Sequence, residues 1–295
     1  MKLSNKFFLI AGVPKSGTSW LWHNLKRYRE IWFTPKKELF YFDRDYKYPS
    51  SSFFAESNYL KRIFGKTESS YQTRREIRKL TKWGLNIEKN PKKFLYYMYY
   101  ILGSGSERWY KSLFFGGRNY EFIGESTATY CLLNKSDIRN ISKIFPKFKA
   151  IIILRNPIER TWSNLKYDHM KNRKVNMNDH KSVRKYLNSD LMLSVNNYPL
   201  IIRTWKNAIG SDRIRFYLFD EIINNKSNLL KKIINFLGEG EITYRQKSLI
   251  EESRNKSFKS DIPANVKKIL YEKNEKNIKI MANQLGFNVG HWLDR

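Results

Sequence analysis

The chain has few of the residues that mark a secreted or membrane-spanning protein. Its 295 residues include one cysteine, Cys131, which excludes an intramolecular disulfide and is expected to pack as a small apolar side chain. No apolar run reaches membrane-spanning length, not even the aromatic run at residues 94–102. The run at residues 7–11 continues into a glycine loop, so a cleaved signal peptide is not expected. These absences predict a soluble, cytoplasmic protein.

Acidic residues are also scarce. There are 27 Asp and Glu against 56 Lys and Arg, which gives a formal net charge of +29. Such an excess predicts an anionic partner: a phosphorylated cofactor, an acidic glycan, an anionic membrane face or nucleic acid. The basic residues are spread along the chain, so many of them are expected only to solvate the surface. Charge alone does not choose among these partners.

The 14 glycines are few, but two of them interrupt the stretch around which the chain is organised. An apolar run at residues 7–11 is followed by Gly12 and Gly17, and residues 20–28 then show helical spacing. A buried parallel strand favours a continuous apolar run, and the turn after it presents backbone N–H groups at a helix start. The stretch therefore predicts a strand, a phosphate-binding loop and a helix.

Two features of a nucleotide-hydrolysing P-loop protein are missing. The pattern G-x-x-x-x-G-K-[ST] requires lysine after the second glycine, but Thr18 stands there and the lysine lies inside the loop, at Lys15. The apolar run at residues 151–154 ends at Arg155, where a Walker-B strand would carry a magnesium-binding aspartate. Arginine cannot bind magnesium, so this position predicts a second anion contact in a site without metal.

Apolar runs alternate with helical patterns along the chain. This alternation predicts an α/β, P-loop-like three-layer fold, with a central mostly parallel β-sheet flanked by helices. Strands are expected at residues 31–34, 121–124, 149–154 and 213–219, and helices at 158–171, 226–237 and 263–285. Basic helical stretches at about 46–116 indicate a helical insertion within a single domain that spans residues 1–295.

Glu38 is a candidate general base because it follows the expected strand at residues 31–34, between lysines and aromatic residues. If that strand lies beside the first one, its carboxyl end opens on the same crevice as the loop. Hydroxyls and a carboxylate at residues 125–130 could line this crevice as well. The alternative is that Glu38 is an ordinary salt-bridged surface residue.

Three segments resemble the sulfotransferases that use 3′-phosphoadenosine 5′-phosphosulfate (PAPS). Residues 14–20 (PKSGTSW) look like the phosphosulfate-binding loop, and residues 155–163 (RNPIERTWS) resemble the motif that holds the 3′-phosphate. Residues 37–42 (KELFYF) are similar to the segment that carries the catalytic glutamate in the glycan-modifying, heparan-sulfate-type branch. The resemblance covers most of the chain except the insertion at 46–116.

This resemblance implies roles for individual residues. Lys15 would contact the oxygen between phosphate and sulfuryl group, and Glu38 would take the proton from the acceptor. Arg155 and Ser163 would bind the 3′-phosphate. The 5′-phosphate would be cradled by Ser16, Gly17, Thr18, Ser19 and Trp20, and a closing loop would add Lys256 and Ser257.

The sequence also departs from the family pattern. Ser126 stands where the glycan branch usually carries lysine, Ala128 where proline is frequent, and Asn156 replaces a usual aspartate. His23 and His169 are alternative bases because other sulfotransferase branches use histidine, although each also fits an ordinary place on a helix surface.

The sequence therefore predicts a sulfotransferase that uses PAPS and no metal, with a hydroxyl or amine of a carbohydrate or glycolipid as acceptor. An anionic acceptor would suit the charge, and peripheral membrane contact is compatible with it. Two alternatives remain open: a basic P-loop-like nucleic-acid or membrane-surface binding protein without catalysis, and a nucleotide kinase. No specific nucleic-acid-binding motif is present, and the Walker lysine and acid are missing.

Overall fold

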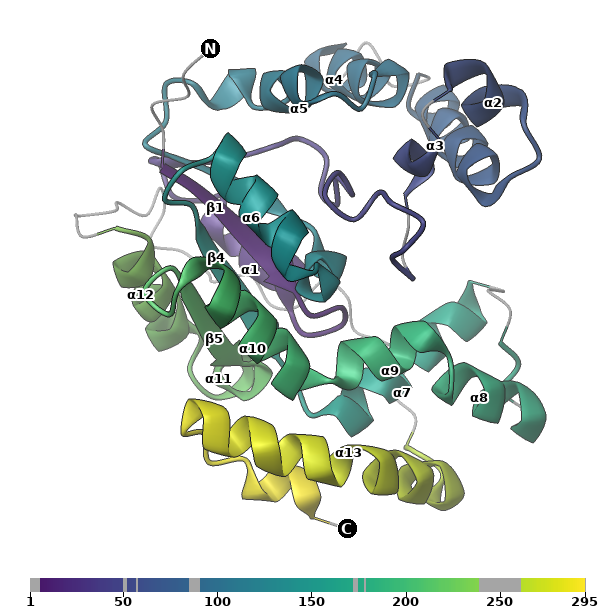
Figure 1. Ribbon diagram of the computed structural model, residues 1–295, viewed down its shortest axis with the longest axis vertical. Coiled ribbons are helices and arrows are strands. Elements are labelled where there is room, and N and C mark those ends of the chain that lie inside the picture. The colour runs from purple at the N-terminus through teal and green to yellow at the C-terminus, as the bar shows by residue number, and fades with distance from the viewer. Residues whose placement is uncertain are drawn as a thin grey trace.

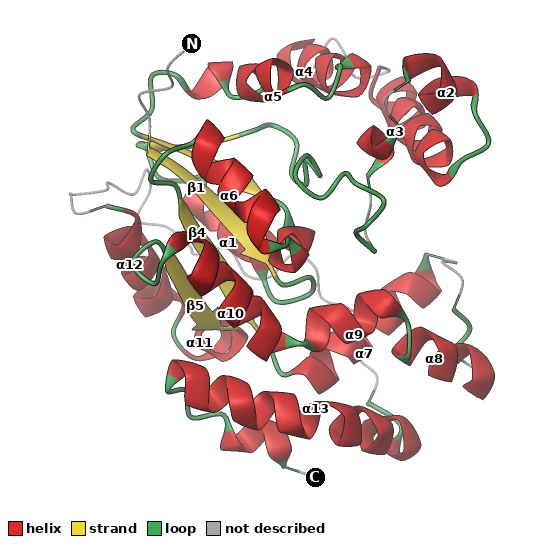
Figure 2. Cartoon of the chain, in the orientation of Figure 1, coloured by secondary structure: helices red, strands yellow, loops and turns green. Residues whose placement is uncertain are grey.

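The computed structural model describes residues 6–49, 52–56, 58–84, 91–171, 175–177, 179–238 and 261–294. Its centre is a five-stranded sheet in the order β2-β3-β1-β4-β5, and every pairing is parallel (Figure 2). The strands are β1 (Lys6–Gly12), β2 (Ile31–Phe33), β3 (Phe122–Ser126), β4 (Lys149–Leu154) and β5 (Ile214–Leu218). The predicted α/β fold with a central, mostly parallel sheet is confirmed.

Helices surround this sheet, with α2–α5 above it and α7–α9 and α13 below it in the view of Figure 1. The described α-helices are α1 (Thr18–Leu25), α2 (Tyr59–Phe64), α3 (Glu68–Gly84), α4 (Pro91–Leu102), α5 (Glu107–Ser112), α6 (Lys135–Ile144), α7 (Pro157–Met170), α8 (His180–Leu187), α9 (Asp190–Asn196), α10 (Tyr198–Ile209), α11 (Phe219–Asn224), α12 (Lys226–Leu237) and α13 (Ala264–Leu285). The short 3-10 helices are η1 (Phe53–Ala55), η2 (Phe115–Gly117), η3 (Ala128–Leu132) and η4 (Gly290–Leu293). None of the described helices is long and apolar enough to cross a lipid bilayer.

The two faces of the sheet have separate apolar cores, because side chains alternate along each strand. On β1, Phe7 and Leu9 face a cluster that includes residues of α6 and α10. Phe8 and Ile10 face a second cluster, built largely from α1 and α12. The result is a three-layer arrangement of helices, sheet and helices.

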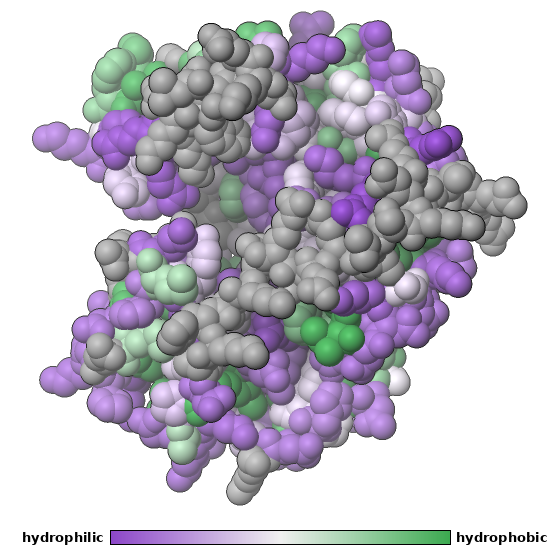
Figure 3. Space-filling model, turned by 180° about the vertical axis from the view of Figure 1, so that it is seen from behind, coloured by the Kyte–Doolittle hydropathy of each residue, from purple (hydrophilic) through white to green (hydrophobic). Residues whose placement is uncertain are grey.

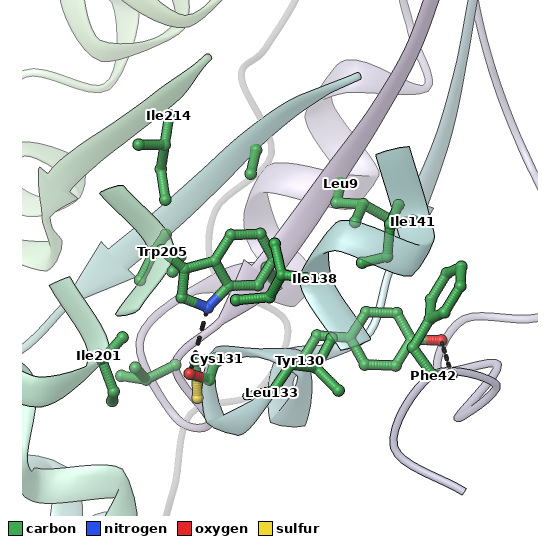
Figure 4. Packing of buried hydrophobic residues seen from close by; sticks show 14 of the residues in the cluster. Leu9, Phe42, Tyr130, Cys131, Leu133, Ile138, Ile141, Ile201, Trp205 and Ile214 are labelled. Atoms are coloured by element: carbon green, nitrogen blue, oxygen red, sulfur yellow. Dashed lines mark hydrogen bonds between the residues drawn. The ribbon is translucent and has the colours of Figure 1, made fainter. Parts of the chain in front are cut away.

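The larger core contains Trp205 of α10, which is completely buried (Figure 4). Its indole Nε1 donates a hydrogen bond to the carbonyl oxygen of Cys131 at 3.3 Å, so the one polar atom of the ring is satisfied. Cys131 is itself buried, as its expected apolar packing requires. This contact joins α10 to η3, directly after β3.

Residues at the end of β4 determine where α7 begins. The side-chain oxygen of Asn156 accepts a hydrogen bond from the N–H of Ile158 at 3.0 Å, and Pro157 occupies the first helical position. Both are favoured at a helix start, where the first N–H groups have no intrahelical partner. Arg155 is thereby fixed at the junction of β4 and α7.

One expectation about the sheet is wrong. β2 pairs with β3 rather than with β1, so β3 separates it from the strand before the phosphate loop. β2 also ends at Phe33, and Glu38 lies beyond it in a loop. The loop after β2 therefore brings the Glu38 carboxylate to the phosphate loop. Glu38 is not at the end of a strand that pairs with β1.

The expected insertion at about 46–116 is helical in its described part, where η1, α2, α3, α4 and α5 follow one another. It lies on the side of the sheet where β2 forms the edge. The division of residues 1–295 into one domain with an insertion stays a prediction.

We expect Trp205→Ala to lower the free energy of unfolding by about 3–5 kcal/mol, because it removes a fully buried indole and leaves a cavity. Leu200→Ala on the same helix is the control, since Leu200 is 45% exposed and should change stability by about 0.5 kcal/mol or less. Urea unfolding followed by circular dichroism measures both. Similar losses in the two variants would contradict this assignment of the core.

Candidate active site

The loop between β1 and α1 has the backbone conformation of an anion-binding turn. Lys15 has φ +69° and Gly17 has φ +86°, so the chain turns sharply and brings successive amides toward one side. A Cβ atom on Gly17 would lie 2.5 Å from Cδ1 of Ile222, so glycine is required there for space as well as for conformation. Sequence and geometry agree on a phosphate loop.

The first turn of α1 is free to bind an anion. Gly17 caps this helix without a side-chain hydrogen bond, so no side chain of the cap occupies the first N–H groups. Ser16 Oγ is buried and has no hydrogen-bond partner among the described residues. The Trp20 side chain packs in the core between α1 and the sheet, so Trp20 offers a ligand only its backbone.

A cavity of about 660 Å³ lies over this loop. It brings together four residues that the sequence predicts as functional: Lys15, Thr18, Ser19 and Glu38. The opposite wall comes from the end of α7 and from α9, and its large apolar side chains are Tyr167, Met170, Leu191, Met192 and Val195. Seen from behind, the molecular surface is notched between its upper and lower halves (Figure 3).

Glu38 is held in one orientation by its backbone and by both carboxylate oxygens. Its φ is +63°, and its N–H donates to the carbonyl oxygen of Ser126 at 2.9 Å. Oε2 accepts a hydrogen bond from the N–H of Ala128 at 2.9 Å, and Oε1 lies 2.6 Å from Nζ of Lys37. The carboxylate is thus anchored at the carboxyl end of β3, within the cavity.

Lys37 is a site residue that the sequence reasoning did not select. Its Nζ bridges Glu38 and the start of α1, at 2.6 Å from Oε1 and 3.5 Å from Oγ1 of Thr18. Neighbouring residues on a strand would point to opposite faces, but residues 37 and 38 lie in a loop and both line the cavity. The sequence feature that could have indicated Lys37 is its position next to the candidate base, Glu38.

A buried carboxyl group, Glu125, supports the segment that carries the base. Its Oε1 accepts a hydrogen bond from Oγ1 of Thr127 at 2.8 Å. The same Thr127 Oγ1 accepts a hydrogen bond from the N–H of Leu39 at 3.0 Å. Tyr130 also hydrogen-bonds to Glu125, and its hydroxyl accepts from the N–H of Tyr41 at 2.9 Å. The expectation that this carboxylate lines the crevice is wrong, because Glu125 is completely buried.

Burial changes the ionisation of the two carboxyl groups behind Glu38. Desolvation raises the pKa of Glu125 to about 7, against the hydrogen bonds of its hydroxyl partners, and the charge of Glu38 adds to the rise. Desolvation likewise raises the pKa of Asp43 to about 7, opposed by the hydrogen bond from Thr129. Glu38 is therefore backed by carboxyl groups that hold protons more readily than exposed ones.

Cations gather on the other side of the loop. Burial lowers the pKa of Lys15, Asp168 opposes this shift, and the charges of Arg155 and Lys166 add to it. Lys15 Nζ lies 4.4 Å from the centroid of the Tyr167 ring. Arg155 Nη1 donates to the carbonyl oxygen of Lys15 at 3.2 Å. Crowded cations of this kind favour a bound anion.

Lys166 was also not selected from the sequence, although the helical period indicates it. It follows Ser163 by three residues on α7, and both side chains are largely buried. The proximity of Lys166 to Arg155 lowers its pKa further, after burial. Neither Ser163 nor Arg155 is among the described residues that line the cavity of Glu38.

The remaining candidates lie elsewhere. Lys256 and Ser257 fall outside the described residues. His23 lines a different groove, and Nδ1 of His169 lies 3.2 Å from the carbonyl oxygen of Val175. Neither histidine is among the described residues that line the cavity of Glu38.

Comparison with known proteins identifies the family. The model of the sulfotransferase family matches residues 8–241, which include the phosphate loop, Glu38 and the junction of β4 and α7. The chain belongs to the sulfotransferase family. No curated protein matches the sequence.

Solved sulfotransferase structures share the fold. A sulfotransferase from Alicyclobacillus acidocaldarius is 16% identical with a TM-score of 0.64, over 98% of this chain and 99% of the other. The sulfotransferase domain of the curacin biosynthetic pathway is 12% identical with a TM-score of 0.52, over 98% and 99% of the two chains. That of the Synechococcus PCC 7002 olefin synthase is 13% identical with a TM-score of 0.52, over 97% and 96%.

The residues of this sulfotransferase fit a phosphorylated nucleotide donor better than a metal. The loop provides open backbone N–H groups and the partnerless Ser16 hydroxyl, and cations stand beside it. Within the described ranges, no group of three or more His, Cys, Asp or Glu side chains is arranged to hold a metal ion. The donor set is therefore one for anionic oxygens.

The raised pKa of Glu125 predicts how the stability of the sulfotransferase depends on pH. The folded state holds a proton that the unfolded chain releases near the ordinary glutamate pKa of 4.5, so stability is lost as pH rises from 4.5 to about 7. We expect Glu125→Gln, which stays neutral, to reduce this loss by about 3 kcal/mol.

Urea unfolding between about pH 5 and pH 8 measures this effect. Glu121→Gln is the matched control, because Glu121 is exposed and pairs with Lys6 at the amino end of β3. An unchanged pH slope in Glu125→Gln would show that the buried carboxyl group is ionised throughout.

Proposed function

We propose that this sulfotransferase transfers the sulfuryl group of PAPS to a hydroxyl, or an amine, of a carbohydrate or glycolipid acceptor in the cytoplasm. The observation that carries the proposal is that Lys15, Glu38 and the first turn of α1 line one cavity. A cation beside an open phosphate loop and an oriented carboxylate are the groups that transfer between two oxygens needs.

The donor would be held by two groups of residues. Ser16, Gly17, Thr18 and Ser19, with the backbone of Trp20, would bind the 5′-phosphate at the start of α1. Bound PAPS would supply an activated sulfuryl group with a phosphate as leaving group. Arg155 and Ser163 would bind the 3′-phosphate, for which a planar guanidinium is well suited.

Lys15 would stabilise the negative charge that develops on the leaving phosphate oxygen. Burial and the charges of Arg155 and Lys166 make its positive charge costly until an anion is present, against the opposing effect of Asp168. The φ of +69° at Lys15 makes this residue part of the sharp turn of the loop. The same residue can therefore act beside the phosphate without displacing it from the loop.

Glu38 would accept the proton of the acceptor hydroxyl or amine. The Ala128 N–H fixes one carboxylate oxygen, and Lys37 contacts the other. Lys37 also approaches Thr18, so it couples the position of the base to the start of α1. The contacts of Lys37 with Glu38 and Thr18 would thus fix the base relative to the donor site, in addition to the sheet.

The cavity supports an acceptor with one polar and one apolar side. Lys15, Lys37 and Glu38 lie on one side, whereas the wall from α7 and α9 combines apolar side chains, two methionines among them, with the polar side chains of Arg160, Asn164 and Asp168. A glycolipid could place its hydroxyl at Glu38 and its apolar part on this wall. The net charge of +29 suits an acceptor that also carries anionic groups.

We expect Glu38→Gln to lower the transfer rate about 10²- to 10⁴-fold and to leave donor binding intact, because it removes only the proton acceptor. Transfer of radiolabelled sulfuryl group to a panel of glycans and glycolipids measures turnover, and equilibrium dialysis with labelled donor measures binding. Glu107→Gln, an exposed carboxylate on α5, should match the unmodified chain. Equal loss of binding and turnover would make Glu38 structural.

Lys15→Ala should lower the transfer rate by about 10²- to 10³-fold, as expected for removal of one charge-stabilising donor. The same transfer assay measures it, with Lys147→Ala as control because Lys147 is an exposed lysine that also has a positive φ. Full activity in Lys15→Ala would contradict the assigned mechanism. A requirement for magnesium would favour phosphoryl transfer instead.

A further inference from the structure

A second groove, of about 840 Å³, runs along the edge strand β2. Its walls come from α1, from β2 and from the start of α4 together with η2. The described residues that line it do not overlap with those that line the cavity of Glu38. The two sites nevertheless share a segment, since Pro35 lines the groove and Lys37, two residues later, lines the cavity.

Aromatic side chains line the groove, although two of them, Trp22 and Phe33, are themselves largely buried. Its aromatic side chains are Trp22, Trp32, Phe33, Tyr96, Phe115 and Tyr120. The Trp32 indole rests on two glycines, because a Cβ on Gly116 would lie 3.0 Å and one on Gly117 2.7 Å from atoms of the ring. Phe115 is 49% exposed. Larger residues at these glycines would displace the indole, so its position depends on the local sequence.

The charged groups of the groove are all basic. Lys26, Lys92 and Lys93 line it, and none of its described lining residues is acidic. Lys26 Nζ lies 4.2 Å from the centroid of the Trp22 ring. Burial lowers the pKa of Lys26, and the charge of Lys93 lowers it further. An anion bound among these lysines would offset their mutual repulsion.

We propose that this groove binds a sulfated saccharide chain outside the active site. Aromatic faces offer flat apolar surface to sugar rings, and lysines at the same groove offer partners for sulfate groups. The choice of a saccharide rests on the proposed function, whereas the anion site rests on the lining of the groove itself. A chain bound along β2 lies next to the segment that carries Glu38, so the groove would retain glycan beside the active site.

Calorimetric titration of the full chain with a sulfated hexasaccharide, in the absence of donor, tests this inference. We expect a combined Lys26→Gln, Lys92→Gln and Lys93→Gln variant to bind about tenfold or more weakly. The control removes the same charge at exposed lysines of α12 and α13, as Lys231→Gln, Lys268→Gln and Lys276→Gln. Equal weakening in both variants would overturn the proposal, because attraction would then follow net charge alone.

A second variant tests the aromatic part. Phe115→Ala, at an exposed position, should weaken the hexasaccharide several-fold and leave inorganic polyphosphate binding unchanged. Equal effects on both probes, or tighter binding of single-stranded nucleic acid than of the hexasaccharide, would overturn the saccharide assignment. Labelled-donor binding should be unchanged in every groove variant, so failure of this site is distinguishable from failure of the proposed sulfuryl transfer.

Discussion

The parallel pairing of β1 with β3 on one side and β4 on the other is the constraint on which the site depends. It brings the carboxyl ends of three strands to one edge of the sheet, which is where ligands bind in open α/β folds. The 3-10 helix η3 approaches the end of β1 very closely there, since a Cβ on Gly12 would lie 2.7 Å from the carbonyl oxygen of Ala128. The phosphate loop, Arg155 and the backbone groups that anchor Glu38 all lie at this edge of the sheet.

Glu38 is held there by hydrogen bonds and an ion pair rather than by regular secondary structure. Glu38 and Phe40 both have positive φ, a conformation that costs non-glycine residues about 1–3 kcal/mol each and persists only where surrounding groups enforce it. The insertion supplies some of those groups. Tyr100 of α4 donates to the carbonyl oxygen of Leu39 at 2.7 Å, and Glu76 of α3 lies 3.5 Å from Nζ of the buried Lys36. The helices α3 and α4 therefore buttress the segment that carries Glu38.

Much of the fold was predictable because its signals are local. The strand at residues 149–154 and the helix at 226–237 have the predicted bounds, since continuous apolar runs and helical spacing are encoded within each segment. The order of the strands in the sheet was not predictable, because the sequence of β2 does not indicate which strand it pairs with. At the site, the glycine loop could be predicted from its sequence. The contacts of Lys37 and the support by Glu125 could not, because they depend on how distant segments meet.

Our central proposal is that one site binds a nucleotide through two phosphate positions beside Glu38. Calorimetric titration of the chain with adenosine 3′,5′-bisphosphate in the presence of EDTA tests it most directly. Saturable binding of one molecule per chain is predicted, weakened by about tenfold or more in Arg155→Ala, whose guanidinium would be lost from the 3′-phosphate. Binding that requires magnesium, or that is unchanged in Arg155→Ala, would contradict it.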